Sequence, residues 1–124
     1  MAVRFESIVP TFRIFSVEKA REFYLDFLGF KLDWEHRFDD NAPLLMRVSR
    51  DGMVFYLSEH HGDGSPGIHV TVYLTGLDDL HAELTAKKYR YYRPGIETMP
   101  WNVRTMGVID PFGNRIFFSE RINK

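Results

Sequence analysis

The stretch that decides the fold is residues 8–29, which reads IVPTFRIFSVEKAREFYLDFLG, together with its counterpart at residues 68–88, which reads IHVTVYLTGLDDLHAELTAKK. Each stretch opens on β-branched and aromatic residues, which are typical of a strand. Apolar residues then recur every three or four positions, which predicts a helix with one buried face. Ser16 is expected to cap the first helix and Gly29 to end it. A strand followed by a helix therefore begins twice in this chain.

Three further strands are predicted after each helix. Phe30–Phe38 alternates apolar and polar residues with the period of a strand, and Asp51-Gly52 is a strong hairpin signal. The expected strands, in chain order, are Ile8–Phe15, Phe30–Phe38, Leu44–Arg50, Met53–Ser58, Ile68–Leu74, Tyr89–Tyr92, Val103–Ile109 and Asn114–Glu120. The expected helices are Val17–Leu28 and Leu77–Lys88, and the expected loops and turns are Asp39–Pro43, Glu59–Gly67, Pro94–Asn102 and Asp110–Gly113.

The order is thus βαβββ twice, over residues 8–60 and 68–120, with an offset of about sixty positions between the halves. An internal repeat is the first thing to settle in assigning a fold. We predict a single α+β domain over residues 1–124, in which two paired βαβββ modules form a concave mixed-sheet cup with the helices outside. A ferredoxin-like domain that only looks repetitive is the alternative, and the matching positions of the hairpin turns in both halves favour the repeat.

Composition excludes several classes of function. The chain has 124 residues, a net charge of −1, 15% aromatic residues and no cysteine, so disulfides, thiolate nucleophiles and Cys-ligated metals are excluded. The near-neutral charge predicts neither a nucleic-acid nor a membrane-surface partner. Apolar runs are too short to span a bilayer. The first seven residues contain Arg4 and Glu6 and lead into no long apolar stretch, so we expect no signal peptide and a cytoplasmic protein.

Three local motifs resemble the glyoxalase/bleomycin-resistance/extradiol-dioxygenase (vicinal oxygen chelate) superfamily, closest to its bleomycin-resistance-type binding proteins. The first motif is the stretch from Val17 to Tyr24, followed by Leu28-Gly29-Phe30. The second is the final hairpin, Asp110–Asn114. The third is Met99–Asn102, which is similar to a Pro-Trp-Gly segment with Asn102 in place of the glycine. The resemblance covers nearly the whole chain and implies the cup-shaped fold, although this fold hosts many chemistries.

The resemblance implies that a metal in such enzymes would be held by His, Glu or Gln side chains at positions that here fall at Val9, Tyr56, His69 and Phe117. Of these only His69 can bind a metal at neutral pH, and one ligand does not outcompete water. We therefore expect no metal, no cofactor and no catalytic residue. His69 is interpreted as a hydrogen-bonded cavity residue, and the cluster Glu59–Asp63 as a polar surface loop rather than a metal or gating loop. Ser58, Ser119 and His69 form no evident catalytic triad.

The alternation of the strands predicts which side chains line the cup. Helix-facing positions include Phe12, Ile14, Phe55, Leu57, Val70, Val72, Leu74, Ile116 and Phe118. Cup-facing positions include Val9, Thr11, Arg13, Val54, Tyr56, Ser58, His69, Thr71, Tyr73, Arg115, Phe117 and Ser119. Ligand sites are mostly apolar clefts with a few polar groups. The predicted ligand-binding residues are Trp34, Phe38, Tyr56, His69, Tyr73, Trp101, Arg115 and Phe117.

The favoured hypothesis is a metal-free protein that sequesters a bulky aromatic or cationic ligand, such as a bleomycin-family antibiotic, without turning it over. The resemblance implies that rings near Trp101 stack on the ligand's flat cationic tail. For Trp34, core packing or a dimer interface is the competing interpretation. The acids that could complement such a ligand, each of which is alternatively a solvated surface charge, are Asp33, Glu35, Asp39, Asp40, Glu59 and Asp63.

Two alternatives remain open. One is a metal-dependent glyoxalase-like lyase, isomerase or dioxygenase with a degenerate ligand set that uses His69 with His60 or His61. The other is a non-catalytic sensor of a small carboxylate, because arginines suit carboxylates and Arg13, Arg104 and Arg115 are available. Whether the chain is an enzyme stays open, with binding favoured.

A homodimer is expected as well. The resemblance implies that a second copy closes the pocket, sometimes with exchange of the first strand. Independently, a single cup leaves aromatic surface exposed, and such surface marks an interaction site. A two-fold dimer is the commonest way to cover it.

Overall fold

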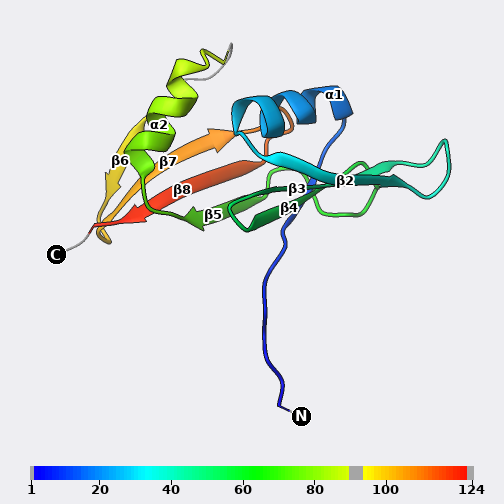
Figure 1. Ribbon diagram of the computed structural model, residues 1–124, viewed down its shortest axis with the longest axis horizontal. Helices are drawn as coiled ribbons and strands as arrows, with labels where there is room; N and C mark the ends of the chain where they lie inside the picture. The colour runs from blue at the N-terminus through cyan, green and yellow to red at the C-terminus, as the bar shows by residue number, and fades with distance from the viewer. Residues whose placement is uncertain (1, 90–93, 123–124) are drawn as a thin grey trace.

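The fold is built from two four-stranded sheets, seen in a computed structural model that describes residues 2–89 and 94–122 (Figure 1). The first sheet has the order β1-β4-β3-β2 and the second β5-β8-β7-β6. The strands of the first sheet are β1 (Thr11–Arg13), β2 (Lys31–Arg37), β3 (Leu44–Arg50) and β4 (Met53–Ser58). The strands of the second are β5 (His69–Tyr73), β6 (Ile96–Met99), β7 (Val103–Ile109) and β8 (Arg115–Arg121).

Both sheets have the same connectivity. The first strand of each module is parallel to its last strand, in the pairs β1–β4 and β5–β8, and all other neighbours are antiparallel. A parallel pair needs a long crossover, and in each module the helix lies in that connection. The predicted fold class, an α+β arrangement of two βαβββ modules, is confirmed.

Each module carries one helix, and each helix has a capped start. The first begins as α1 (Val17–Ala20) and continues without a break as the π-helix η1 (Arg21–Phe27). The Ser16 hydroxyl accepts a hydrogen bond from the Lys19 amide at 3.1 Å, as the sequence predicted. The second helix is α2 (Leu77–Ala86), and there the Glu120 carboxylate of β8 accepts from the first amides instead.

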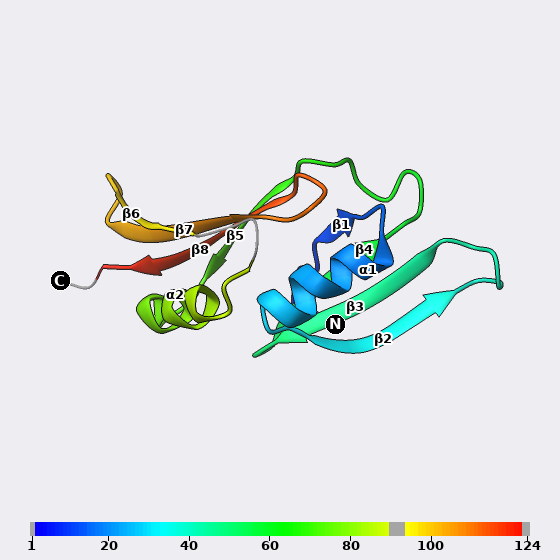
Figure 2. The same ribbon diagram turned by 90° about the horizontal axis from the view of Figure 1, so that it is seen from above.

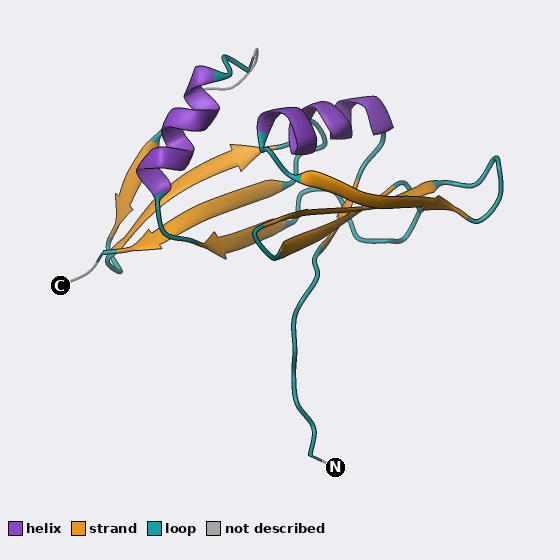
Figure 3. Cartoon of the chain, viewed as in Figure 1, coloured by secondary structure: helices purple, strands orange, loops and turns teal. Residues whose placement is uncertain are grey.

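The helices lie on one side of the sheets (Figures 1 and 3). Seen from above, the edge strands β1 and β5 lie toward the middle of the molecule, with β2 and β6 at the outside (Figure 2). The N-terminal segment before β1 leaves the body on the side away from the helices (Figure 1). Within the described residues, no helix has the length and hydropathy needed to cross a membrane.

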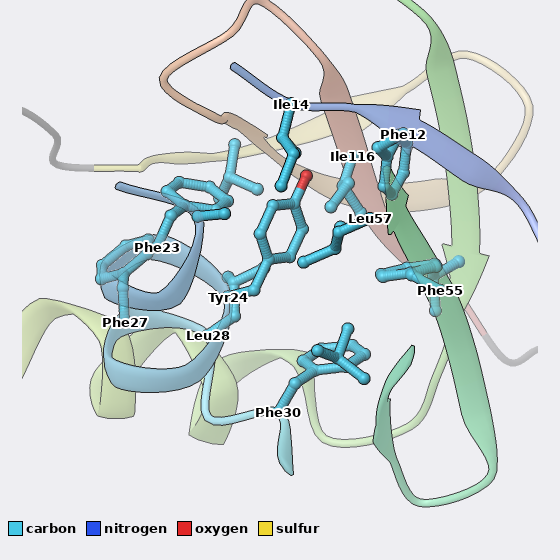
Figure 4. Packing of buried hydrophobic residues seen from close by; sticks show 14 of the residues in the cluster. Phe12, Ile14, Phe23, Tyr24, Phe27, Leu28, Phe30, Phe55, Leu57 and Ile116 are labelled. Atoms are coloured by element: carbon cyan, nitrogen blue, oxygen red, sulfur yellow. The ribbon is translucent and has the colours of Figure 1, made fainter. Parts of the chain in front are cut away.

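The core lies between the helices and the sheets and is rich in aromatic rings (Figure 4). Tyr24 stacks near Phe12 and meets Phe23 edge-on at 5.0 Å between ring centroids. The core is one cluster that joins residues of both modules. Every predicted helix-facing strand residue is buried or partly buried, because alternation sends these side chains to the apolar side of each sheet.

One junction between the modules is a buried polar cluster around Asp110. The Tyr24 hydroxyl of the first helix donates to the Asp110 carboxylate at 2.7 Å. The Asn114 side chain donates to Asp110 at 2.9 Å and to the Arg13 carbonyl at 3.1 Å. Burial, followed by the nearby Asp110 charge, raises the pKa of Tyr24 well above its ordinary value. The turn after β7 is thereby fixed to the first module.

A second junction is a charged link between β3 and α2. The Arg50 guanidinium donates two hydrogen bonds to the Glu83 carboxylate, at 2.8 and 2.9 Å, and a third to the Leu28 carbonyl at 2.7 Å. These bonds from Arg50 lower the pKa of the Glu83 carboxyl. Lys87 donates to the carbonyls of Asp26 and Phe27 at the end of the first helix.

The structure corrects one predicted loop. Residues Ile96–Met99, expected within the loop Pro94–Asn102, form strand β6 paired with β7. Pro94 and Pro100 flank this strand, at positions where a proline removes no ladder hydrogen bond. Of the predicted strand Tyr89–Tyr92, residues 90–92 lie outside the described residues, and Tyr89 lies outside any strand.

Other differences concern the ends of elements. The first strand is shorter than the predicted Ile8–Phe15, because residues 2–8 extend away from the sheet and pair with no strand in the described part of the chain. The second helix ends at Ala86, two residues before the predicted end. Strands β3, β4 and β7 have the predicted bounds.

Candidate functional site

The candidate site is the face of the two sheets that points away from the helices, which we call the open face. By register and alternation it carries Thr11, Arg13, Trp34, Arg47, Tyr56 and Ser58 on the first sheet and His69, Thr71, Tyr73, Thr105, Arg115, Phe117 and Ser119 on the second. Most of these side chains are exposed or partly exposed, whereas Ser58, Thr105 and Ser119 are buried by neighbouring side chains and loops.

On the first sheet the open face presents an aromatic pair. Trp34 of β2 and Tyr56 of β4 lie on either side of Arg47 of β3, and their ring centroids are 5.9 Å apart. Trp34 is 40% exposed. Arg47 also lies 3.6 Å from the carboxylate of Asp33, which sits at an irregularity of the β2–β3 register. The predicted residues Trp34 and Tyr56 are therefore brought together.

On the second sheet the open face presents another ring pair. His69 of β5 and Phe117 of β8 have ring centroids 4.3 Å apart. Arg115 is the direct register partner of His69. Beneath Phe117 lies Gly107 of β7, where an added Cβ would stand only 2.7 Å from the ring. The phenyl ring thus rests on bare backbone, which places it low on the sheet.

The remaining predicted residues lie toward the ends of the sheets. Tyr73, at the far end of β5, is covered by the Arg121 guanidinium, which lies 4.1 Å from the ring centroid. Phe38 follows β2 and is 73% exposed, edge-on to His36 and His60.

Trp101 lies in the turn between β6 and β7 and is 66% exposed. The turn brings Asn102 to a φ of +62°, in the left-handed region where glycine and asparagine are best tolerated. This explains how Asn102 can stand where the similar Pro-Trp-Gly segment has its glycine.

The two aromatic pairs remain separate. Within the described residues, no ring contact joins the Trp34–Tyr56 pair to the His69–Phe117 pair. Trp101 and Phe38 also extend from different sheets. One chain therefore supplies two aromatic surfaces rather than one enclosed pocket.

The polar loop after β4 is held by its own hydrogen bonds. The Ser58 hydroxyl donates to the Asp63 carboxylate at 2.9 Å and accepts from the His60 amide at 3.0 Å. Ser58 is thus bonded to a carboxylate directly rather than to an imidazole base, which a Ser-His-Asp triad would need. This arrangement agrees with a structural role for the loop.

Several charged candidates are engaged in contacts within the fold. Glu35 pairs with Arg21, and Glu59 accepts from the Leu44 amide at 3.0 Å. Arg104, considered from the sequence as a carboxylate ligand, instead forms two hydrogen bonds with Asp78 of α2 at 2.8 and 2.9 Å. These bonds lower the pKa of the Asp78 carboxyl and raise that of Arg104.

The residues at the superfamily's metal positions do not fit a divalent metal. The Val9 and Phe117 side chains carry no donor atom, and a phenol such as that of Tyr56 is a poor ligand. This leaves only the His69 imidazole, which packs on a phenyl ring. Elsewhere in residues 2–89 and 94–122, no three His, Asp or Glu side chains gather as a metal site would require.

Some residues of the open face were not singled out from the sequence. Arg47 lies between Trp34 and Tyr56, and Arg121 covers Tyr73. Gly107 gave a usable signal, because a glycine inside a strand often marks a close approach of another group. The two arginines gave none, since their positions depend on register and on side-chain conformation.

The fold has many solved counterparts. A protein assigned to the glyoxalase family from Bacillus anthracis superposes with a TM-score of 0.74 at 20% identity, covering 98% of this chain and 99% of that one. The bleomycin-binding protein of the bleomycin producer Streptomyces verticillus, solved with copper(II)-bleomycin, gives 0.71 at 24% identity, with 99% and 100% covered. The antibiotic-binding protein TnmS3 from a Streptomyces species gives 0.71 at 19%, with 98% of both chains covered.

No curated protein matches the sequence. At these identities the solved structures establish the fold alone. The sequence itself, however, matches over residues 1–124 the family described as glyoxalase superfamily protein. The chain therefore belongs to the glyoxalase superfamily.

Proposed function

We propose that this protein binds and sequesters a bulky, flat, cationic small molecule of the bleomycin class on its open face, without turning it over. The observation that carries the proposal is the uncovered aromatic surface: the Trp34–Tyr56 pair on one sheet, the His69–Phe117 pair on the other, and Trp101 standing 66% exposed in its turn. Aromatic faces attract cations, by about 0.5–2 kcal/mol for each contact. Several rings acting together give useful affinity.

Binding rather than catalysis is favoured by the donor set. The open face holds a single imidazole at the superfamily's metal positions, and the Ser58 hydroxyl is bonded to Asp63 instead of a base. The known structures that bind bleomycin or another antibiotic on the same fold support the same ligand class here.

The first test is a tryptophan-fluorescence titration of the chelator-treated protein with metal-free bleomycin. We expect saturable quenching with a Kd below about 1 μM, which corresponds to about 8 kcal/mol of binding free energy. Trp101→Ala is expected to weaken binding about 2- to 30-fold, which corresponds to the loss of one cation–aromatic contact.

The matched variant Trp101→Phe retains an aromatic face and is expected to keep most of the affinity. Equal affinity in wild type and in Trp101→Ala would contradict a role for that ring. No quenching up to high micromolar bleomycin would reject the bleomycin class.

We also propose that a second copy of the chain completes the pocket. The two aromatic surfaces of one chain do not meet, and the N-terminal arm, residues 2–8, extends from the body on the same side as the open face. Its apolar side chains are almost fully exposed, at 86% for Val3, 97% for Phe5 and 88% for Ile8. Such uncovered apolar groups indicate an interaction surface.

A dimer predicts that the apparent molecular mass in solution depends on protein concentration. Sedimentation equilibrium should report about twice the 14.6 kDa chain mass, and Phe5→Ser/Ile8→Ser should raise the dimer dissociation constant at least tenfold. Burying one such side chain contributes about 1.5–3 kcal/mol, and 1.4 kcal/mol is tenfold. Arg4→Ser, in the same arm, is the control and should change the dimer dissociation constant little. A wild-type protein that stays monomeric at about 100 μM would contradict the proposal.

One observation favours a small carboxylate as a second ligand class. The Arg13 Nε atom is buried and has no hydrogen-bond partner among the described residues. The Asn114–Arg13 hydrogen bond brings the start of β8, with the exposed Arg115, beside the end of β1. Guanidinium groups bind carboxylates well. Binding of a small carboxylate in the absence of bleomycin binding, together with loss of carboxylate binding in Arg13→Gln, would establish this alternative.

A further inference from the structure

The two modules meet at two equivalent places, which the repeat relates by the offset of sixty residues. At the first, Phe15 beyond β1 packs against Phe112 of the β7–β8 turn with ring centroids 6.1 Å apart. The Tyr24–Asp110 and Asn114–Arg13 hydrogen bonds close the same junction. At this junction two aromatic rings and two hydrogen bonds link the modules, although Phe15 stays 56% exposed.

The second junction is left open, and we call its hollow the seam cavity. There Thr75 occupies the position equivalent to Phe15, so a methyl and a hydroxyl replace a phenyl ring. The facing β3–β4 turn is also shorter, with only Asp51 and Gly52 between the paired residues Arg50 and Met53. A cavity of about 450 Å³ remains between this turn, the end of β5 and α2.

Apolar side chains form the deeper part of the seam cavity's mixed walls. Its lining includes the buried side chains Leu28, Phe30, Val72 and Phe118 and the partly buried Leu74 and Leu80. Met53 and Tyr73 stand at its rim, 42% and 44% exposed. The volume lies within the range of small-molecule sites, about 300 to 1,000 Å³.

The charges of the seam cavity are unbalanced. Arg50 is the one cation in its lining, and it is held by two hydrogen bonds to Glu83 and one to the Leu28 carbonyl. Asp51 and Asp79 also line the cavity, and neither forms an ion pair or side-chain hydrogen bond within the described part of the chain. Lys87 lies 3.7 Å from the same Glu83 carboxylate, and the Asp51 charge acts on Arg50, so the acids around the cavity exceed the cations by one charge.

We propose that the seam cavity is a second binding site, for a small amphiphilic amine whose apolar body lies against Phe30, Val72 and Phe118 and whose ammonium group faces Asp51 and Asp79. The excess negative charge disfavours a carboxylate ligand, which the acids would repel. Of the cavity's lining only Tyr73 also belongs to the open face, and the other lining residues lie on the helix side of the sheets or in the turns beside it. The proposal can therefore be tested independently of the bleomycin proposal.

The test measures the binding of three matched probes to the full chain by two-dimensional amide NMR. The probes are tryptamine, its neutral isostere tryptophol, and the anion indolepropionate. We expect tryptamine to shift the amides of Thr75, Gly76 and Leu80 saturably, tryptophol to bind at least about fivefold more weakly, and indolepropionate to cause no shift. A fivefold difference is about 1 kcal/mol, the size of one ion contact in high dielectric.

Two variants separate the contributions. Asp51→Asn/Asp79→Asn should reduce tryptamine to the affinity of tryptophol. Thr75→Phe, which copies the first junction, should abolish binding while the other amide resonances keep their positions. Glu18→Gln, which removes an exposed acid of α1 outside the cavity lining, is the control and should bind tryptamine as wild type does. Equal binding of all three probes, no amide shift with tryptamine, or undiminished binding by Thr75→Phe would each overturn the proposal.

Discussion

Replacing Asp110 by alanine is expected to lower the free energy of unfolding by at least about 3 kcal/mol, because hydrogen bonds to a charged group contribute about 1.5–3 kcal/mol each. The buried carboxylate accepts four of them: from the amides of Phe112 and Asn114, both at 2.8 Å, from the Asn114 side chain at 2.9 Å and from the Tyr24 hydroxyl at 2.7 Å. Alanine leaves all four donors without this partner.

Chemical denaturation in urea measures the effect. Asp110→Asn retains the shape and one acceptor oxygen and should lose about half as much stability. Asp40→Ala removes an exposed acid in the loop after β2 and, as a surface substitution, should stay within about 0.5 kcal/mol of wild type. A loss below about 1 kcal/mol in Asp110→Ala would show that the cluster is not a structural junction.

Tyr24 is expected to make the protein unfold at alkaline pH. Burial and the Asp110 charge raise the pKa of its phenol in the folded state, so the unfolded chain releases this proton first, near pH 10. The stability contributed by the neutral phenol is complete below about pH 10 and is lost as pH rises beyond it. The loss can reach about 1.4 kcal/mol for each pH unit.

Urea unfolding at about pH 9, 10 and 11 tests this slope. Tyr24→Phe cannot ionise at this position, so its free energy of unfolding should fall less steeply as the pH rises above 9. At pH 9 this variant should already be less stable than wild type, because it lacks the hydrogen bond to Asp110. Parallel slopes in the two proteins would mean that another group controls alkaline unfolding.

The fold could be predicted because it depends on local patterns. Alternation and the Asp51-Gly52 turn gave the bounds of β3 and β4, since a two-residue hairpin leaves no freedom of register. Strand β6 was missed because its flanking prolines, Pro94 and Pro100, suggested a loop. The first strand was predicted too long, since no pattern in the sequence indicates whether an extended segment finds a neighbour.

The site could be predicted only in part. Alternation alone places Tyr56, His69 and Phe117 on the face away from the helices. The Arg104–Asp78 pair and the seam cavity depend instead on how the helices and modules pack against each other. Local patterns in the sequence do not indicate that packing. Ligand contacts of the predicted residues stay a prediction.

The glycine beneath Phe117 has a consequence for how the shape of the open face could change. Gly107 does not adopt a left-handed backbone, so its strand would accept alanine or a larger residue without turning. Any added side chain would have to lift the phenyl ring toward solvent. The depth of the open face at this point is thus set by one missing methyl group, and a single codon change could make it shallower while the rest of the sheet stays as it is.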